Sequence, residues 1–151
     1  MIQRIQSIYL LIAVVVNIAC LCLQIGSFIS NDMITANVYN LWTVNAIDGS
    51  RVFNTWPLFA ILIFSSAIGI YTIFMYSNRI VQARFCVFNS LLIIGWYILY
   101  AVFAHVLVNN GEQFSPAFAA ILPIVSLIGF ILARRGIIHD EKMVRAADRI
   151  R

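Results

Sequence analysis

The sequence predicts an all-α membrane protein: an antiparallel four-helix transmembrane bundle with a short β-hairpin in its first outer loop and a C-terminal cytoplasmic amphipathic helix. Composition supports this, because 62% of the residues are hydrophobic and only 11% are charged, whereas soluble domains contain roughly 45–50% apolar and about 25% charged residues. Four long apolar segments alternate with polar ones, and nine of the ten Lys and Arg residues fall on one side of these segments. We therefore expect a single membrane domain over residues 1–151.

Each apolar segment can form a helix that crosses the bilayer, whose hydrocarbon core of about 30 Å requires about 20 residues. The expected spans cover residues 7–28, 57–76, 85–108 and 116–133. The first run continues for eight residues beyond Cys20. We therefore expect it to be kept as a span and not cleaved as a signal peptide.

Residues at the ends of the spans agree with these limits. Ser115 is a good N-cap, and Pro116 follows it at the first helical position, where its missing N–H costs little. Pro57 opens the second span in the same way, next to Trp56 at interfacial depth. Pro123 is expected to kink the fourth span. The short links after the second and third spans require antiparallel neighbours.

The distribution of cations predicts the orientation. The side that lacks most cations carries only Arg51, in the long outer loop of residues 29–56. Because Lys and Arg near span ends collect in the cytoplasm, we expect both termini to be cytoplasmic. The cations on that side are Arg4, Arg79, Arg84, Arg134, Arg135, Lys142, Arg145, Arg149 and Arg151.

The outer loop contains a hairpin signal. Residues 38–44 are enriched in β-branched and aromatic side chains, Asp48-Gly49 is a favourable turn pair, and residues 51–53 can pair back. We expect a short hairpin over the outer end of the bundle, and we favour a stabilising loop over a binding loop.

Polar side chains inside the spans are the first candidates for function, because lipid makes them costly. His105 is the only Asp, Glu, Lys, Arg or His well inside a span. An interhelical hydrogen bond, for example to Gln24, is the structural interpretation, and a single proton-handling site is the alternative. The candidate intramembrane positions are Asn17, Gln24, Ser65, His105 and Ser126.

Motifs for catalysis are absent from the sequence. It contains no His–Glu metal spacing, no nucleophile elbow and no glycine-rich phosphate loop. We expect no catalytic residues, no cofactor and no metal, and hence no enzyme. The three cysteines, Cys20, Cys22 and Cys86, are interpreted as packing residues. No basic run is interleaved with aromatic residues, so nucleic acid is not an expected partner.

The tail of residues 134–151 has apolar residues at helical spacing and a favourable pair, Glu141 and Arg145, four apart. We expect a short amphipathic helix that lies on anionic lipid headgroups or docks onto a partner protein. The candidate cytoplasmic surface consists of Arg4, Arg134, Arg135, Arg145, Asp148 and Arg149.

Both ends of the chain resemble a known family. The opening MIQRIQSIYLL, the pair Arg134-Arg135 and the ending DEKMVRAADRIR are similar to a family of small Bacteroidota proteins catalogued only as a domain of unknown function, number 4293. The resemblance implies a multi-pass protein of the inner membrane with four spans, and it implies no activity. The arrangement also resembles the claudin architecture, with residues 39–42 where that family has a tryptophan motif. The loop cysteine pair of claudins is missing, and fold likeness carries no function.

Two functions follow as expectations. The first is a non-enzymatic structural or accessory subunit of a membrane assembly, with a membrane-protein partner or a second copy of the chain. The alternative is a small oligomeric transporter or channel, with Asn17, His105 and Ser126 lining the path.

Overall fold

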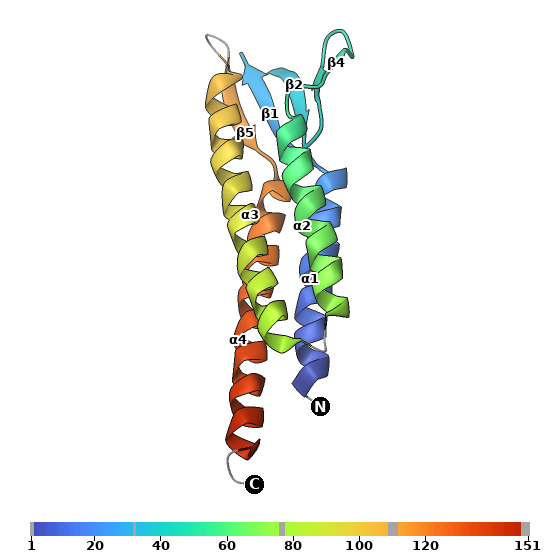
Figure 1. Cartoon of the computed structure of the whole chain (residues 1–151). Helices are drawn as coiled ribbons and strands as arrows, with labels where there is room; N and C mark the ends of the chain where they lie inside the picture. The colour runs from blue at the N-terminus through green and yellow to red at the C-terminus, as the bar shows by residue number, and fades with distance from the viewer. Residues whose placement is uncertain (1, 32, 76–77, 109–111, 149–151) are drawn as a thin grey trace.

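The computed structural model describes residues 2–31, 33–75, 78–108 and 112–148. Over these residues the chain forms four α-helices, one short 3-10 helix and five β-strands. The helices run along the axis of an elongated molecule, and the strands form a sheet at one end (Figure 1). In chain order the helices are α1 (Ile2–Cys22), α2 (Trp56–Phe74), α3 (Arg79–Val106), η1 (Phe118–Ile121) and α4 (Leu122–Asp148).

The sheet is antiparallel, and its strands lie in the order β4-β3-β2-β1-β5. Four of the strands precede α2, whereas β5 comes from the link between α3 and α4 and pairs with β1. The link after α3 therefore completes a sheet that the first loop begins. The strands are β1 (Gln24–Ser30), β2 (Met33–Tyr39), β3 (Thr43–Asn45), β4 (Arg51–Val52) and β5 (Gln113–Pro116).

The predicted fold class, an all-α four-helix transmembrane bundle with one hairpin, is wrong. The described residues combine four helices with a five-stranded sheet. Three helical segments are long and apolar enough to cross a membrane, namely Trp56–Phe74, Arg79–Val106 and Phe118–Ala146, whereas the apolar helix Gln6–Cys22 is shorter. The pairing of β3 with β4 does occur on either side of the expected Asp48-Gly49 turn, where Gly49 adopts a φ of +63°.

The error begins at the end of the first predicted span. Residues 24–28, which were included in that span, belong to strand β1. Hydropathy cannot separate a short buried strand from a continuing helix, because both are apolar. Gly26 was the available signal, since a glycine inside a strand often marks close approach of another group. A Cβ at Gly26 would overlap the ring of Phe114 in β5.

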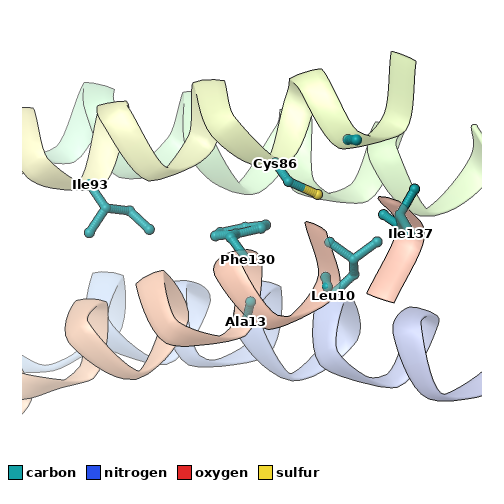
Figure 2. Packing of buried hydrophobic residues seen from close by; sticks show 8 residues of the cluster. Leu10, Ala13, Cys86, Ile93, Phe130 and Ile137 are labelled. Atoms are coloured by element: carbon teal, nitrogen blue, oxygen red, sulfur yellow. The ribbon is translucent and has the colours of Figure 1, made fainter. Parts of the chain in front are cut away.

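The helices pack in a closed order, in which α1 contacts α2 and α4, and α3 contacts the same two helices. Gly129 allows α1 and α4 to approach closely, because a Cβ there would lie 3.0 Å from Ala13 Cβ and 3.2 Å from the Tyr9 carbonyl oxygen. Figure 2 shows the buried side chains that fill the space between α1, α3 and α4, including Leu10, Ile93 and Phe130. Gly129 therefore serves a contact between two helices of the same chain.

The C-terminal tail is also different from its prediction. No break follows Ala133, because α4 continues to Asp148 as one helix. Gly136 is tolerated inside it, and a Cβ there would lie 3.0 Å from Gln6 Cγ of α1. Gln6 Nε2 donates to Asp140 Oδ2 at 2.5 Å, and both residues are buried. Because these contacts hold the tail against α1, it is an extension of α4 and not a separate amphipathic helix.

Asn40 joins the sheet to the helices. Its Nδ2 donates to the carbonyl oxygen of Cys20 at 2.7 Å, near the C-terminal end of α1. Its Oδ1 accepts from Trp96 Nε1 of α3 at 3.1 Å. Both Asn40 and Trp96 are fully buried. One amide therefore connects α1, α3 and the segment that follows β2.

Two tyrosines of α3 extend this connection. Tyr100 stacks on Trp96 with ring centroids 5.0 Å apart, and its hydroxyl donates to the Ile25 carbonyl of β1 at 2.8 Å. The Tyr97 hydroxyl donates to the Ala120 carbonyl of η1 at 2.7 Å. Each ring packs in the apolar interior while its polar atom satisfies a backbone group of another element.

We expect Asn40→Ala to destabilise the protein strongly. The change leaves the buried Trp96 N–H without its acceptor, at about 1–3 kcal/mol. It also removes the shorter of two bonds to the Cys20 carbonyl, which keeps the Leu23 N–H at 3.4 Å. Thermal unfolding in detergent should show a fall in Tm of about 5–10 °C. Asn45→Ala is the matched control, because it removes only an exposed bond to Ser50 Oγ. Equal shifts for the two variants would contradict the role given to Asn40.

Candidate functional site

The buried polar side chains of the helices come together across three helices. Asn17 Nδ2 of α1 donates to Ser65 Oγ of α2 at 3.1 Å. Asn89 of α3 lies on the other side of Ser65, and all three residues are fully buried. The structure thus unites two predicted site residues, Asn17 and Ser65, with a third residue that was not predicted.

Asn89 binds the backbone of α2. With its amide nitrogen toward α2, it donates to the Ser65 carbonyl at 3.1 Å and to Ser65 Oγ at 3.2 Å. Its oxygen then accepts from the Gly69 N–H at 3.2 Å. Gly69 also allows α1 to approach α2 closely, because a Cβ there would lie 2.5 Å from Val14 Cγ2 of α1. The polar cluster of Asn17, Ser65 and Asn89 therefore fastens α1, α2 and α3 together.

Two buried polar atoms in the helical part lack a hydrogen-bond partner among the described residues. They are Asn17 Oδ1 and Ser126 Oγ. Asn17 is on α1 and Ser126 on α4, the two helices that meet at Gly129. These atoms are the only part of the predicted intramembrane set with spare hydrogen-bonding capacity in the described interior.

Gln24 and His105 lie apart from this cluster. Gln24 is in β1, and its Nε2 donates to the Gly26 carbonyl and to Asn37 Oδ1, each at 3.0 Å. His105 is exposed in the last turn of α3. It follows Asn89 by 16 residues, or about 24 Å along a helix that rises 1.5 Å per residue. The suggested bond from His105 to Gln24 is thus replaced by bonds within the sheet.

Sequence reasoning missed Asn40, Gln82 and Asn89, all of which are buried. Asn89 could have been predicted from the sequence, because it is a polar side chain inside the predicted span 85–108, which is the criterion that selected Asn17. Gln82 donates to the Thr72 carbonyl of α2 at 3.1 Å, and its position just before that span gave no comparable signal. Asn40 gave no signal either, since outer-loop amides are ordinarily solvated.

The predicted cytoplasmic surface is partly described. Arg134 and Arg135 are exposed on α4, and Arg145 Nε donates to Glu141 Oε1 at 2.9 Å. Arg4 is in α1 and Asp148 is in α4, but their side chains lie outside the description, and Arg149 lies outside the described residues.

Arg134 and Arg145 line a pocket of about 390 Å³ between the start of α3 and the last turns of α4. We call it the basic pocket. Its cationic residues are Arg79, Arg84, Arg134, Lys142 and Arg145, and its one acidic residue is Glu141. Its apolar residues are Ile80, Ala83, Val87, Ile137 and Ile138.

The described part of the chain offers less support for a metal site or a cysteine-based site. No group of three or more His, Cys, Asp or Glu residues there could hold a metal ion. Cys20, Cys22 and Cys86 are free thiols, of which Cys22 alone is exposed. The observed sites are therefore a polar cluster inside the helical part and a basic pocket at the end far from the sheet.

The fold and these sites define an apolar helical protein capped by a sheet and compatible with residence in a membrane. The chain belongs to the family described as Domain of unknown function (DUF4293), whose profile matches residues 2–150. No curated protein matches the chain. The family description assigns no activity.

Asn89→Ala tests the polar cluster as a packing element. Removal of its bonds to α2 should cost about 1 kcal/mol, the scale of interhelical hydrogen bonds in membranes. In detergent, Tm should fall by about 2–4 °C. Ser90→Ala is the matched control, because Ser90 Oγ donates to the Cys86 carbonyl of its own helix at 2.9 Å. A larger loss for Ser90→Ala than for Asn89→Ala would refute the assignment.

Proposed function

We propose that this protein is an integral inner-membrane protein that acts as a non-enzymatic structural or accessory subunit of a membrane assembly. The observation that carries the proposal is the polar cluster. Asn17 and Asn89 each bind Ser65, and Asn89 also binds the α2 backbone. Polar groups that hold helices together stabilise a scaffold, and of this cluster only Asn17 Oδ1 lacks a partner among the described residues.

Exposed apolar residues support residence in a membrane. Phe64 and Phe74 of α2 are 64% and 73% exposed, and Leu91 and Ile98 of α3 are 60% and 61% exposed. Such a surface would be costly in water and suits lipid acyl chains or the helices of a partner. The three long apolar helices are consistent with the same setting.

The charge distribution supports an orientation. The start of α3 and the end of α4 lie at the end of the molecule opposite the sheet (Figure 1). The described cations gather there, and Arg51 is in β4 at the sheet end. By the positive-inside rule, the sheet faces outward and the end of α4 faces the cytoplasm.

The alternative, a small oligomeric transporter, receives weaker support. The unpartnered atoms Asn17 Oδ1 and Ser126 Oγ are the observation in its favour. His105 is distant from them, at about 24 Å along α3 from Asn89. A continuous path through these three residues would need contributions from another copy of the chain.

Cysteine labelling tests the orientation. In a Cys22→Ser background, Asp48→Cys in the outer turn should react with a membrane-impermeant maleimide when the cytoplasmic membrane is intact. Met143→Cys, at a position that is 58% exposed on α4, should react only after lysis. The two positions control for each other, and the reverse pattern would overturn the orientation.

Photo-crosslinking from native membranes tests the subunit role. A photoreactive residue at Met143 should capture one membrane protein, or a second copy of the chain, in constant ratio across preparations. Phe64, which is 64% exposed in the middle of α2, is the comparison position, and we expect it to crosslink to lipid. A solitary protein would contradict the proposal if it also conducted solutes in liposomes and lost that flux on Asn17→Ala.

A further inference from the structure

The basic pocket has the two chemical parts that a phospholipid has. Its apolar side chains include Ala83 and Ile137, which are nearly or fully buried and belong to the core cluster between the helices. Ile80 and Val87 are 46% and 37% exposed along the same pocket. An apolar surface that begins in the core and continues to the outside of the helices can receive an acyl chain.

Cations line the same pocket from both helices. Arg79 and Arg84 come from α3, and Arg134, Lys142 and Arg145 come from α4. Within the described part of the chain, Arg145 alone of these cations forms an ion pair, with Glu141 at 2.9 Å. The neighbouring acid Asp140 accepts a bond from Gln6 of α1. The pocket therefore has a strong excess of positive charge, which favours an anionic occupant.

The length of α3 places this charge at the headgroup level. Its 28 residues extend about 42 Å, which exceeds the hydrocarbon core by about 12 Å, or about eight residues. Charged side chains avoid the hydrocarbon. Arg79 and Arg84, at the start of α3, thus mark the end of the helix that protrudes toward the headgroups.

The cations form two tiers along the helices. Arg79 and Arg84 are five residues apart on α3, or about 7–8 Å along its axis. On the antiparallel helix α4, Arg134 and Lys142 are eight residues apart, or about 12 Å. On each helix one cation of the pocket lies farthest from the protruding end, and we call these two, Arg84 and Arg134, the inner tier; Arg79, Lys142 and Arg145 are the outer tier. Two tiers can bind two phosphates of one headgroup.

We propose that the basic pocket binds an anionic glycerophospholipid of the cytoplasmic leaflet, with preference for a headgroup that carries two phosphates, as in cardiolipin. Basic pockets between helices on the cytoplasmic side favour such headgroups. The phosphates contact the two tiers, Ile80 lies beside the glycerol region between them, and the acyl chains run inward from Val87. The inference rests on the membrane setting and orientation of the proposed function, and it adds a specific partner at this end of the molecule.

Lipid titration of the intact chain, purified in detergent, tests the proposal by native mass spectrometry. Cardiolipin should bind more tightly than phosphatidylglycerol, and phosphatidylethanolamine should bind least. Arg134→Gln should weaken cardiolipin binding on the order of fivefold, since one cation near an anionic surface contributes about that factor. Arg84→Gln combined with Arg134→Gln should weaken it further, on the order of 25-fold.

Arg135→Gln is the matched control. Arg135 is the next residue of α4, is exposed, and does not line the pocket. Arg135→Gln removes the same charge as Arg134→Gln. Because that charge is exposed to screening outside the pocket, its removal should change cardiolipin binding by less than about twofold. Equal effects of Arg134→Gln and Arg135→Gln would overturn the site and indicate attraction by net charge alone. Equal affinities for cardiolipin and phosphatidylglycerol would overturn the two-phosphate assignment. Displacement of cardiolipin by inorganic phosphate at equal concentration would overturn the acyl-chain contacts.

A second measurement keeps the result separate from the proposed function. A photoreactive residue at Ile80 in native membranes should crosslink to phospholipid, and crosslinking to protein alone would overturn the lipid assignment. The orientation and the subunit role are tested by other positions, Asp48 and Met143. If those tests succeed and Ile80 captures no lipid, the pocket proposal fails by itself. If the orientation is reversed while purified protein still binds cardiolipin, the leaflet assignment fails and the pocket stands.

Discussion

The rest of the structure depends on how α3 satisfies buried backbone groups of elements distant in sequence. A helix that ends inside an apolar environment leaves carbonyl groups without partners, and an indole N–H buried nearby has the opposite need. Asn40 meets both needs, because its amide donates to Cys20 and accepts from Trp96. Tyr100 repeats the device by donating to the Ile25 carbonyl. These directional bonds fix where α1 ends, and they seat the sheet on the helices.

The need to pair buried polar groups also explains the polar residues between the helices. In lipid, a polar side chain without a partner is costly, so amides and hydroxyls there act as connectors. Asn17 and Asn89 converge on Ser65 from two helices. A function that requires a free polar group finds it at Ser126 and at the second amide atom of Asn17, and nowhere else in the described interior of the helices. Because nearly all of these interior polar groups are paired, we favour a scaffold whose specific contacts lie at its two ends.

Those two ends differ in chemistry. The sheet end carries Arg51, whose guanidinium carbon lies 5.3 Å from the centroid of the Trp42 ring. The opposite end gathers cations from α3 and α4 into one pocket above an apolar floor. Neither helix has such a site alone, because its charges are spread over several turns. Antiparallel packing of α3 and α4 produces the pocket. The cations that indicate the orientation of the protein are therefore also the cations that line the proposed lipid site.

By itself, the sequence determined which segments are apolar, that the Lys and Arg residues other than Arg51 gather on one side of them, the hairpin at Asp48-Gly49, and membership of the family. These properties are local, since hydropathy, charge and turn chemistry are read from neighbouring residues. Tertiary structure decided that residues 24–28 form a strand, that a strand from the link after α3 pairs with them, and that the tail continues α4. Each of these depends on a distant partner: Phe114 beside Gly26, and Gln6 beside Gly136. The polar cluster and the basic pocket escaped prediction for the same reason, because their members lie on different helices whose order only packing sets.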